Sequence, residues 1–180
     1  MALKIVPAHW HLGSLRQWHW ISSAVCLVGM LLFAATGITL NHAAIIPATP
    51  VVTSIESVLP PSVLDAVIVP DSDKASLSKD LRAWLERELD IYIPASARGE
   101  WSDEEVYVAL PRPGGDAWLS IDLAGGDILY ERTTRGWIAY LNDLHKGRDT
   151  GTAWSWFIDV FAIACVVFCV SGLLLLQRHA

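Results

Sequence analysis

Charged residues are missing from two long stretches of this 180-residue sequence. Asp, Glu, Lys and Arg are all absent from residues 18–40, and Asp159 is the only formally charged residue in the stretch 153–177. A helix rises about 1.5 Å per residue, so either stretch is long enough to cross a hydrocarbon core of roughly 30 Å. We therefore predict transmembrane helices over residues 18–41 and 153–177. The first stretch is longer than the apolar part of a secretory signal, and no clear small-x-small cleavage motif follows it, so we interpret it as a retained anchor.

Cysteine is missing from the segment between these two stretches. Cys26, Cys165 and Cys169 all lie within the apolar runs, so the segment has no disulfide framework. We interpret the three as small residues that pack between helices, with a redox or metal-binding role as the alternative. Glycine-rich phosphate loops, zinc-type Cys/His spacings and a serine nucleophile elbow are also absent. The net charge of −6 argues against a nucleic-acid partner.

The distribution of charge predicts an orientation in the membrane. The tails, residues 1–17 and 178–180, contain lysine and arginine but no acid, whereas residues 43–136 hold sixteen acidic against eight basic residues. Because basic residues near a membrane end tend to stay in the cytoplasm, we expect both termini there and the middle of the chain outside. Lys146 and Arg148 lie on the opposite side in this arrangement. A lipid headgroup, a carboxylate of the protein or a ligand would explain their position.

The middle of the chain, residues 42–140, is predicted to be a small extramembrane domain. Leucines and a tryptophan recur at helical spacing over residues 76–91, with Ser76 as the expected N-cap and Asp80 in the first turn. Apolar and polar residues then alternate on both sides of an Ala-Gly-Gly-Asp turn, which is typical of a β-hairpin. The stretch before the helix, rich in Pro and Val, is expected to be extended. The predicted fold class is therefore an α+β membrane protein, in which two transmembrane helices flank a helix packed on an antiparallel sheet.

Histidines gather at the predicted membrane boundaries. Residues 141–152, "LNDLHKGRDTGT", are interpreted as an interfacial loop that carries His145 directly before the second span. Because each helix crosses once, His42 and His145 must lie on one side of the membrane, and His19 and His179 on the other. Two imidazoles at one end of a helix bundle are what a haem iron needs for its axial positions.

The neighbours of His145 fit the same hypothesis. Asp143 is a candidate acceptor that would orient the imidazole, and Lys146 and Arg148 are candidate partners for haem propionates. Histidine is also common at membrane interfaces simply because it is amphipathic, so each of these histidines has this second interpretation. His19 and His42 point about 140° apart around an ideal helix and lie roughly 35 Å apart along it, so they would serve separate haems.

Asp159 is the second unusual feature of the spans. An ionisable group inside a membrane is costly and generally faces protein or water. A structural ion pair or helix contact is one interpretation, and a proton-handling or quinone-contacting role is the other. Small residues in "AATG" at 34–37 and in the row Ala164, Phe168, Gly172 favour close helix approach. Because two helices make a thin bundle, we expect a homodimer or a larger membrane complex.

Three segments of the sequence resemble a known family. "LRQWHWISSAVCLVGMLLFAATGITL", "IDLAGGDILYERTTRGWIAYLNDLHKGRDTG" and "WFIDVFAIACVVFCVSGLLLL" are similar to the PepSY-associated transmembrane helix proteins of bacteria. The resemblance implies an inner-membrane protein with a periplasmic PepSY domain. Larger members include reductases linked to iron-siderophore uptake, which carry haem on histidines of their membrane helices. For this chain it implies haem b at His42 and His145, although larger members have four or more spans rather than two.

Two functions follow as hypotheses. The first is an electron-transfer subunit that passes electrons through haem to a periplasmic acceptor, such as a ferric siderophore or a redox protein. The second is a membrane-anchored PepSY module that binds or regulates another periplasmic protein without redox activity. Interfacial histidines are expected under both, and no catalytic residue is assigned from the sequence.

Overall fold

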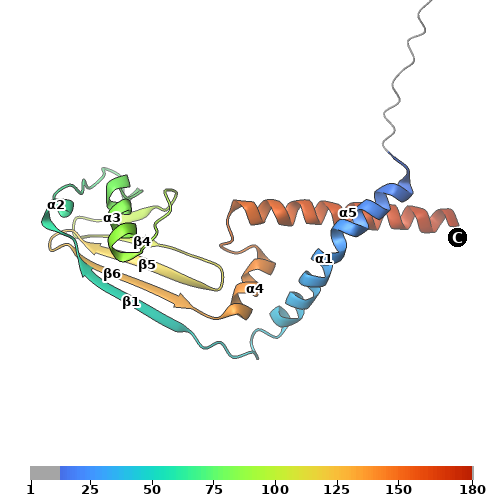
Figure 1. The fold of residues 1–180 in the computed structure, drawn as a ribbon, viewed down its shortest axis with the longest axis horizontal. Helices are drawn as coiled ribbons and strands as arrows, with labels where there is room; N and C mark the ends of the chain where they lie inside the picture. The colour runs from blue at the N-terminus through green and yellow to red at the C-terminus, as the bar shows by residue number, and fades with distance from the viewer. Residues whose placement is uncertain (1–12, 180) are drawn as a thin grey trace, which may run out of the picture. The chain divides into compact units, whose positions relative to one another are not determined.

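The computed structural model describes residues 13–179, with side chains as far as Arg178. It divides into two compact units, one containing the chain up to residue 38 together with the chain from residue 151 on, and the other containing residues 39–150 (Figure 1). The described part of the first unit is helical. The second unit contains the sheet and three shorter helices.

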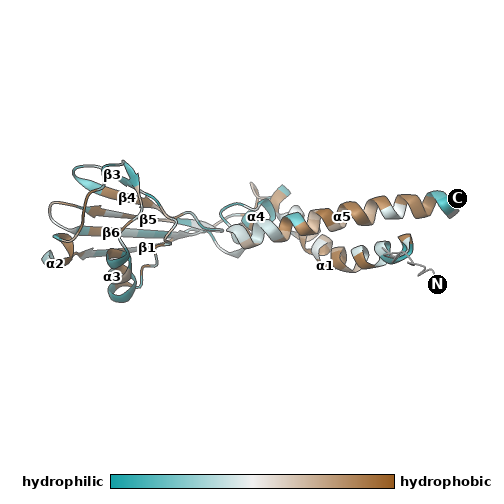
Figure 2. Ribbon diagram, turned by 90° about the horizontal axis from the view of Figure 1, so that it is seen from above, coloured by the Kyte–Doolittle hydropathy of each residue, from teal (hydrophilic) through white to brown (hydrophobic). Residues whose placement is uncertain are grey.

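The helical unit consists of most of α1 (Leu15–Asn41) and of α5 (Thr152–His179). Figure 2 shows that apolar residues cover both helices, and only 17% and 6% of their most apolar stretches are buried. A core helix of a soluble protein would be covered by its own chain, so this exposure fits surfaces that face lipid. The chain is therefore a membrane protein with two membrane-spanning helices, as the sequence predicts.

The two spans run antiparallel and pack through small and aromatic residues. Near one end, His19 of α1 lies beside Phe168 and Ser171 of α5. Further along, Phe33 stacks on Phe161 with ring centroids 5.1 Å apart. Gly29 contacts the ring of Phe161 so closely that no side chain fits there. Cys26 is fully buried between these two contacts and Ser22 nearly so, and the described residues contain no disulfide.

The second unit is built on one antiparallel sheet of six strands in the order β1-β6-β5-β4-β3-β2. The strands are β1 (Val51–Val58), β2 (Lys74–Ala75), β3 (Gly99–Trp101), β4 (Glu105–Ala109), β5 (Gly115–Asp122) and β6 (Asp127–Thr134). Strict alternation along β5 buries Ala117, Leu119 and Ile121 on one face. The predicted hairpin joins β5 to β6, where Gly126 has φ +81° and its amide donates to the carbonyl of Asp122.

Helix α3 (Lys79–Leu89) covers the buried face of the sheet, and the short α2 (Pro61–Leu64) precedes it in the chain. Leu81 and Leu85 of α3 pack in one cluster with Val106, Leu119 and Ile121 of the strands. This confirms the helix packed on an antiparallel sheet. The predicted N-cap, Ser76, is wrong by two residues. The N-cap is Ser78, whose Oγ accepts a hydrogen bond from the amide of Leu81 (3.2 Å), whereas Ser76 donates to the carbonyl of Ala95.

Two segments form secondary structure that the sequence did not predict. Residues 141–146 belong to α4 (Trp137–Lys146) rather than to a loop. Their charges resemble a loop, but they form the second half of a helix that begins at Trp137 and is followed by Gly147 with φ 66°. The segment after α1 is extended as expected, but residues 51–58 also pair with β6 along their whole length. That pairing joins residues about 80 positions apart in sequence, which local patterns do not reveal.

Candidate functional site

The end of α1 and helix α4 meet within the second unit. Thr39 Oγ1 donates a hydrogen bond to Asn142 Oδ1 over 2.8 Å, and Asn142 is only 8% exposed. His42 follows Thr39 by three residues, and His145 follows Asn142 by three residues. Residues spaced by three lie one turn apart on the same side of a helix. His145 therefore lies one helical turn beyond this contact on α4, whereas His42 lies in the turn that directly follows α1.

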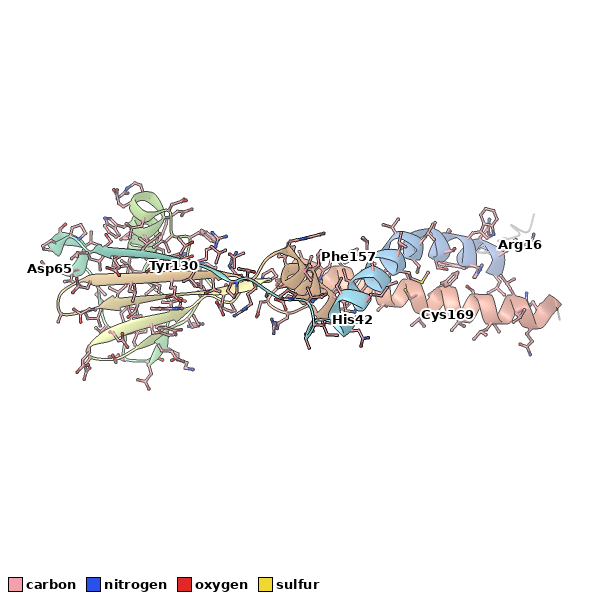
Figure 3. All side chains as sticks on the ribbon, turned by 90° about the horizontal axis from the view of Figure 1, so that it is seen from below. Arg16, His42, Asp65, Tyr130, Phe157 and Cys169 are labelled. Carbon is pink, nitrogen blue, oxygen red and sulfur yellow. The ribbon has the colours of Figure 1, made fainter. Side chains whose placement is uncertain are left out.

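The backbone around both histidines is well defined by hydrogen bonds. His42 lies just beyond the end of α1 (Figure 3). Its carbonyl accepts from the amides of Ile45 (2.9 Å) and Ile46 (3.0 Å) in a tight turn directly after the helix. His145 lies in the last turn of α4 and is partly buried, with Lys146 exposed beside it. Basic side chains in the last turn suit the negative end of the helix dipole. Fixed backbones of this kind can hold an imidazole in one position.

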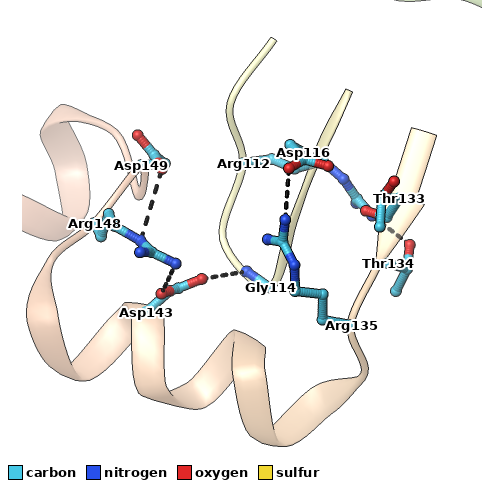
Figure 4. A network of polar contacts seen from close by, with 9 residues as sticks. All are labelled: Arg112, Gly114, Asp116, Thr133, Thr134, Arg135, Asp143, Arg148 and Asp149. Atoms are coloured by element: carbon cyan, nitrogen blue, oxygen red, sulfur yellow. Dashed lines mark hydrogen bonds and ion pairs between the residues drawn. The ribbon is translucent and has the colours of Figure 1, made fainter. Parts of the chain in front are cut away.

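Asp143 is the most buried charged residue described, with 4% of its surface exposed. Its Oδ2 accepts from the amide of Gly114 (2.9 Å), in the turn between β4 and β5, and its Oδ1 pairs with Arg148 Nη2 at 2.7 Å (Figure 4). The amide of Arg148 also donates to the carbonyl of Asp143. These contacts fasten α4 to the sheet. The carboxylate predicted to orient His145 is thus occupied by Gly114 and Arg148.

The structure accounts for one of the two unexpected cations. Of the three partners considered for Arg148, a carboxylate of the protein is present, because Asp143 pairs with it and Asp149 lies 4.0 Å away. Lys146 makes no ion pair with a described residue. Its ammonium group remains available to a propionate or a lipid phosphate.

His19 is engaged between the two spans. Its Nδ1 forms a hydrogen bond with Ser171 Oγ (3.0 Å), and its ring stacks on Phe168 with centroids 4.9 Å apart. The Cε1 atom lies so near Gly172 that a methyl group there would approach it to 3.1 Å. These contacts favour a helix-packing role for His19. The side chain of its predicted partner, His179, lies outside the described residues.

Asp159 lies on the exposed surface of α5. It makes no hydrogen bond or ion pair with another described residue, so the predicted ion pair is not formed within the described part of this chain. Within residues 13–179, no three His, Cys, Asp or Glu side chains gather in a group suited to a metal ion.

A cleft opens on the helix-bearing face of the sheet, beyond the end of α3. It has a volume of about 590 Å³. It is lined by the segment after α3, by the end of β4 with the following turn, and by the middle of β6. Arg112 and Arg132 both line it, together with Tyr92 and Tyr130. Partial burial, and then the nearby charge of Arg132, lower the pKa of Arg112.

Sequence reasoning missed several residues that hold this region together. Gly114, with φ +72°, packs against the backbone of Tyr140, and Asn142 anchors the end of α1. The sequence "RPGGD" at 112–116 signals a turn, yet nothing in it points to α4 as the partner. Arg112 and Arg132 are twenty positions apart, so only the strand pairing brings them together.

Comparison with known proteins gives one match. A family described as "Putative PepSY_TM-like" matches residues 10–180, which is nearly the whole chain. Searches of curated proteins and of solved structures found no match.

Proposed function

Because the chain belongs to the PepSY_TM-like family, we propose that it is a haem-binding electron-transfer subunit of a membrane complex, with His42 and His145 as the axial ligands. The observation that carries this proposal is the hydrogen bond from Thr39 to Asn142, which joins the two segments three residues before His42 and three residues before His145. Two imidazoles, one in the turn after α1 and one on α4, form a donor set that suits a haem iron. When bound, haem b would supply one-electron redox chemistry at this end of α4.

The residues around the ligands have separable roles in this proposal. Asp143 fixes α4 to the turn at Gly114 and thereby fixes the backbone that carries His145. Lys146 offers its ammonium group to a propionate, whereas Arg148 stabilises Asp143 and acts on the site only through it. His19 and His179 are assigned no ligand role within this site. Asp159 serves helix contacts rather than electron transfer.

The test is the haem content of the full chain purified in mild detergent from cells supplied with haem precursor. Reduced-minus-oxidised absorption spectra of the parent should contain sharp low-spin b-type bands. His42→Ala and His145→Ala should each lose most of the bound haem, while His19→Ala keeps it, because His19 packs against Ser171 and Phe168. Equal haem in all four proteins would rule out the assigned ligands.

The location and partners are part of the same proposal. We propose that the termini lie in the cytoplasm of a bacterium and that the sheet domain lies in the periplasm, facing an acceptor such as a ferric siderophore or a redox protein. Exposed Asp159 supports a homodimer or a larger complex, because a carboxylate facing lipid is costly until another helix covers it. If that is so, Asp159→Leu should change the size of the detergent-solubilised complex. An unchanged mass by light scattering would contradict this arrangement.

A second candidate is a membrane-anchored module that binds or regulates a periplasmic protein. The observation in its favour is that Asp143 and Arg148 pair with each other inside a domain that has its own apolar core. In this function the polar residues of α4 position the domain and bind no cofactor. Affinity capture with the full chain, compared with a variant in which both cleft arginines are replaced, tests it. Recovery of the same proteins by both would count against a role for the cleft.

A further inference from the structure

The arginine cleft on the sheet has no role in haem binding. No histidine lines it, and it is formed by the segment 90–97, the turn after β4, and β6. Ala117 of β5 also lines it. Ala117 pairs directly with Arg132 of β6, and Tyr130 lies two residues before Arg132 on that strand. The volume of about 590 Å³ lies within the range of small-molecule sites, roughly 300–1,000 Å³.

Direct ion pairs do not neutralise the two arginines of the cleft. Neither Arg112 nor Arg132 forms an ion pair with a described carboxylate. Asp116, the nearest acid in sequence to Arg112, pairs with Arg135 at 2.6 Å and points to the opposite face of the sheet from Ala117. Asp90 lines the cleft but bonds to neither guanidinium. Two positive charges therefore line one cleft, in a domain whose balance is acidic.

Hydrogen bonds hold the side chain of Arg112 in place, but one of its N–H donors has no acceptor. Its Nη2 donates to the carbonyl of Thr133 and to Thr134 Oγ1 (Figure 4), while its buried Nε has no hydrogen-bond partner. Buried donors are nearly always paired in native proteins. Like charges brought together on a rigid sheet also cost free energy unless an anion joins them. A ligand with negative oxygens would relieve both.

We propose that this cleft binds a small ligand with one oxyanion group, a phosphate or a carboxylate, carried on an apolar body. Arginine guanidinium groups recognise planar or tetrahedral oxyanions through paired N–H donors. Tyr92, Tyr130, Leu110 and the two prolines of the lining provide the apolar contact for the rest of the molecule. The ligand could be soluble or the headgroup of an anionic lipid, because both present the same chemistry.

The experiment uses the full chain in nanodiscs of phosphatidylcholine, titrated with phenyl phosphate by isothermal calorimetry at low salt. We expect saturable binding that weakens as salt rises. Arg132→Gln should weaken it by at least about tenfold, the loss expected for one charge-assisted contact. The exposed side chain of Arg132 makes no hydrogen bond with a described residue, so this variant keeps the fold even if Arg112→Gln does not. Arg98→Gln is the matched control, because Arg98 is exposed and does not line the cleft.

Repeating the titration with phosphatidylglycerol in the nanodiscs distinguishes the two sources. Weaker phenyl phosphate binding would identify the lipid headgroup as an occupant, and unchanged binding would identify a soluble ligand. Absence of binding in phosphatidylcholine, or equal affinity in Arg132→Gln and the parent, would overturn the proposal. The haem content of Arg132→Gln should equal that of the parent, so this result is independent of the haem proposal.

Discussion

At the residue scale, Asp143 is the side chain on which the attachment of α4 depends. One carboxylate, almost wholly buried, satisfies the amide of Gly114 and pairs with a partly exposed arginine. A buried carboxylate is costly unless it is paired, and here each oxygen has a donor. The residue predicted as a helper of His145 is therefore first of all a structural residue. Its effect on a haem ligand would be indirect, through the position of α4.

Removing this carboxylate should destabilise the second unit. Asp143→Ala leaves the Gly114 amide buried without an acceptor and Arg148 without its partner, which we expect to cost about 2 kcal/mol in the free energy of unfolding. Urea denaturation of the full chain in mild detergent, followed by tryptophan fluorescence, measures it. Asp149→Asn is the control, because its contact with Arg148 is long, at 4.0 Å. Equal midpoints for Asp143→Ala and the parent would contradict the structural role.

Gly114 and Gly136 form a matched pair for a second prediction. Both have positive φ, +72° and +87°, so alanine at either position costs roughly 1–3 kcal/mol in backbone strain. Only at Gly114 does the new methyl group meet a neighbour, at 2.7 Å from Tyr140 Cβ and 2.8 Å from its Cα. We expect Gly114→Ala to lose about 2 kcal/mol more than Gly136→Ala in the same denaturation experiment. Similar losses would mean that the turn does not pack on α4.

At the element scale, the two spans depend on close approach rather than on polar contacts. Gly29, in the middle of α1, lies against the ring of Phe161, and a hydrogen bond joins His19, near the start of α1, to Ser171 of α5. Lipid is as apolar as the helices, so shape complementarity decides their association. The sequence pointed to the small residues of 34–37 and to Gly172 as contact sites. Gly172 lies next to His19, but Gly29 was not anticipated.

Gly29→Ala should therefore separate the helices. The added methyl group overlaps the ring of Phe161. We expect the free energy of unfolding of the detergent-solubilised chain to fall by about 2 kcal/mol, which lowers its melting temperature. Gly172→Ala meets only the edge of His19, at 3.1 Å, and should cost less than half as much. Melting followed by circular dichroism compares the two. If Gly172→Ala were the more damaging change, the packing of α1 on α5 would differ from that described.

At the scale of the whole molecule, the sequence predicted what depends on local patterns and missed what depends on distant pairing. Long uncharged runs identified both spans, and alternation around the Ala-Gly-Gly-Asp turn identified the β5–β6 hairpin. Helix α4 was not predicted because the polar residues of its second half resemble a loop, and one of them, Asp143, contacts Gly114 and Arg148. Strand β1 and the arginine cleft arise from pairings across the domain, and β2 and β3 are too short to leave a pattern.

The candidate haem site shows the same division. The sequence placed His42 and His145 on one side of the membrane by counting crossings alone, and both lie in the same compact unit of the structure. It did not predict the hydrogen bond from Thr39 to Asn142, because the sides of α1 and α4 that meet are decided by tertiary packing. The sequence likewise left three kinds of partner open for Arg148, because only its charge was known. Its actual partner became evident only with the position of α4.

The most direct test of the central proposal is the electron paramagnetic resonance spectrum of the oxidised, haem-loaded chain. Two imidazole ligands would give low-spin ferric iron, and loss of either one would give high-spin ferric iron. We predict a low-spin signal for the parent and for His19→Ala, with conversion to high spin in any haem retained by His42→Ala or His145→Ala. A high-spin parent, or a low-spin signal that survives both substitutions, would contradict ligation by His42 and His145.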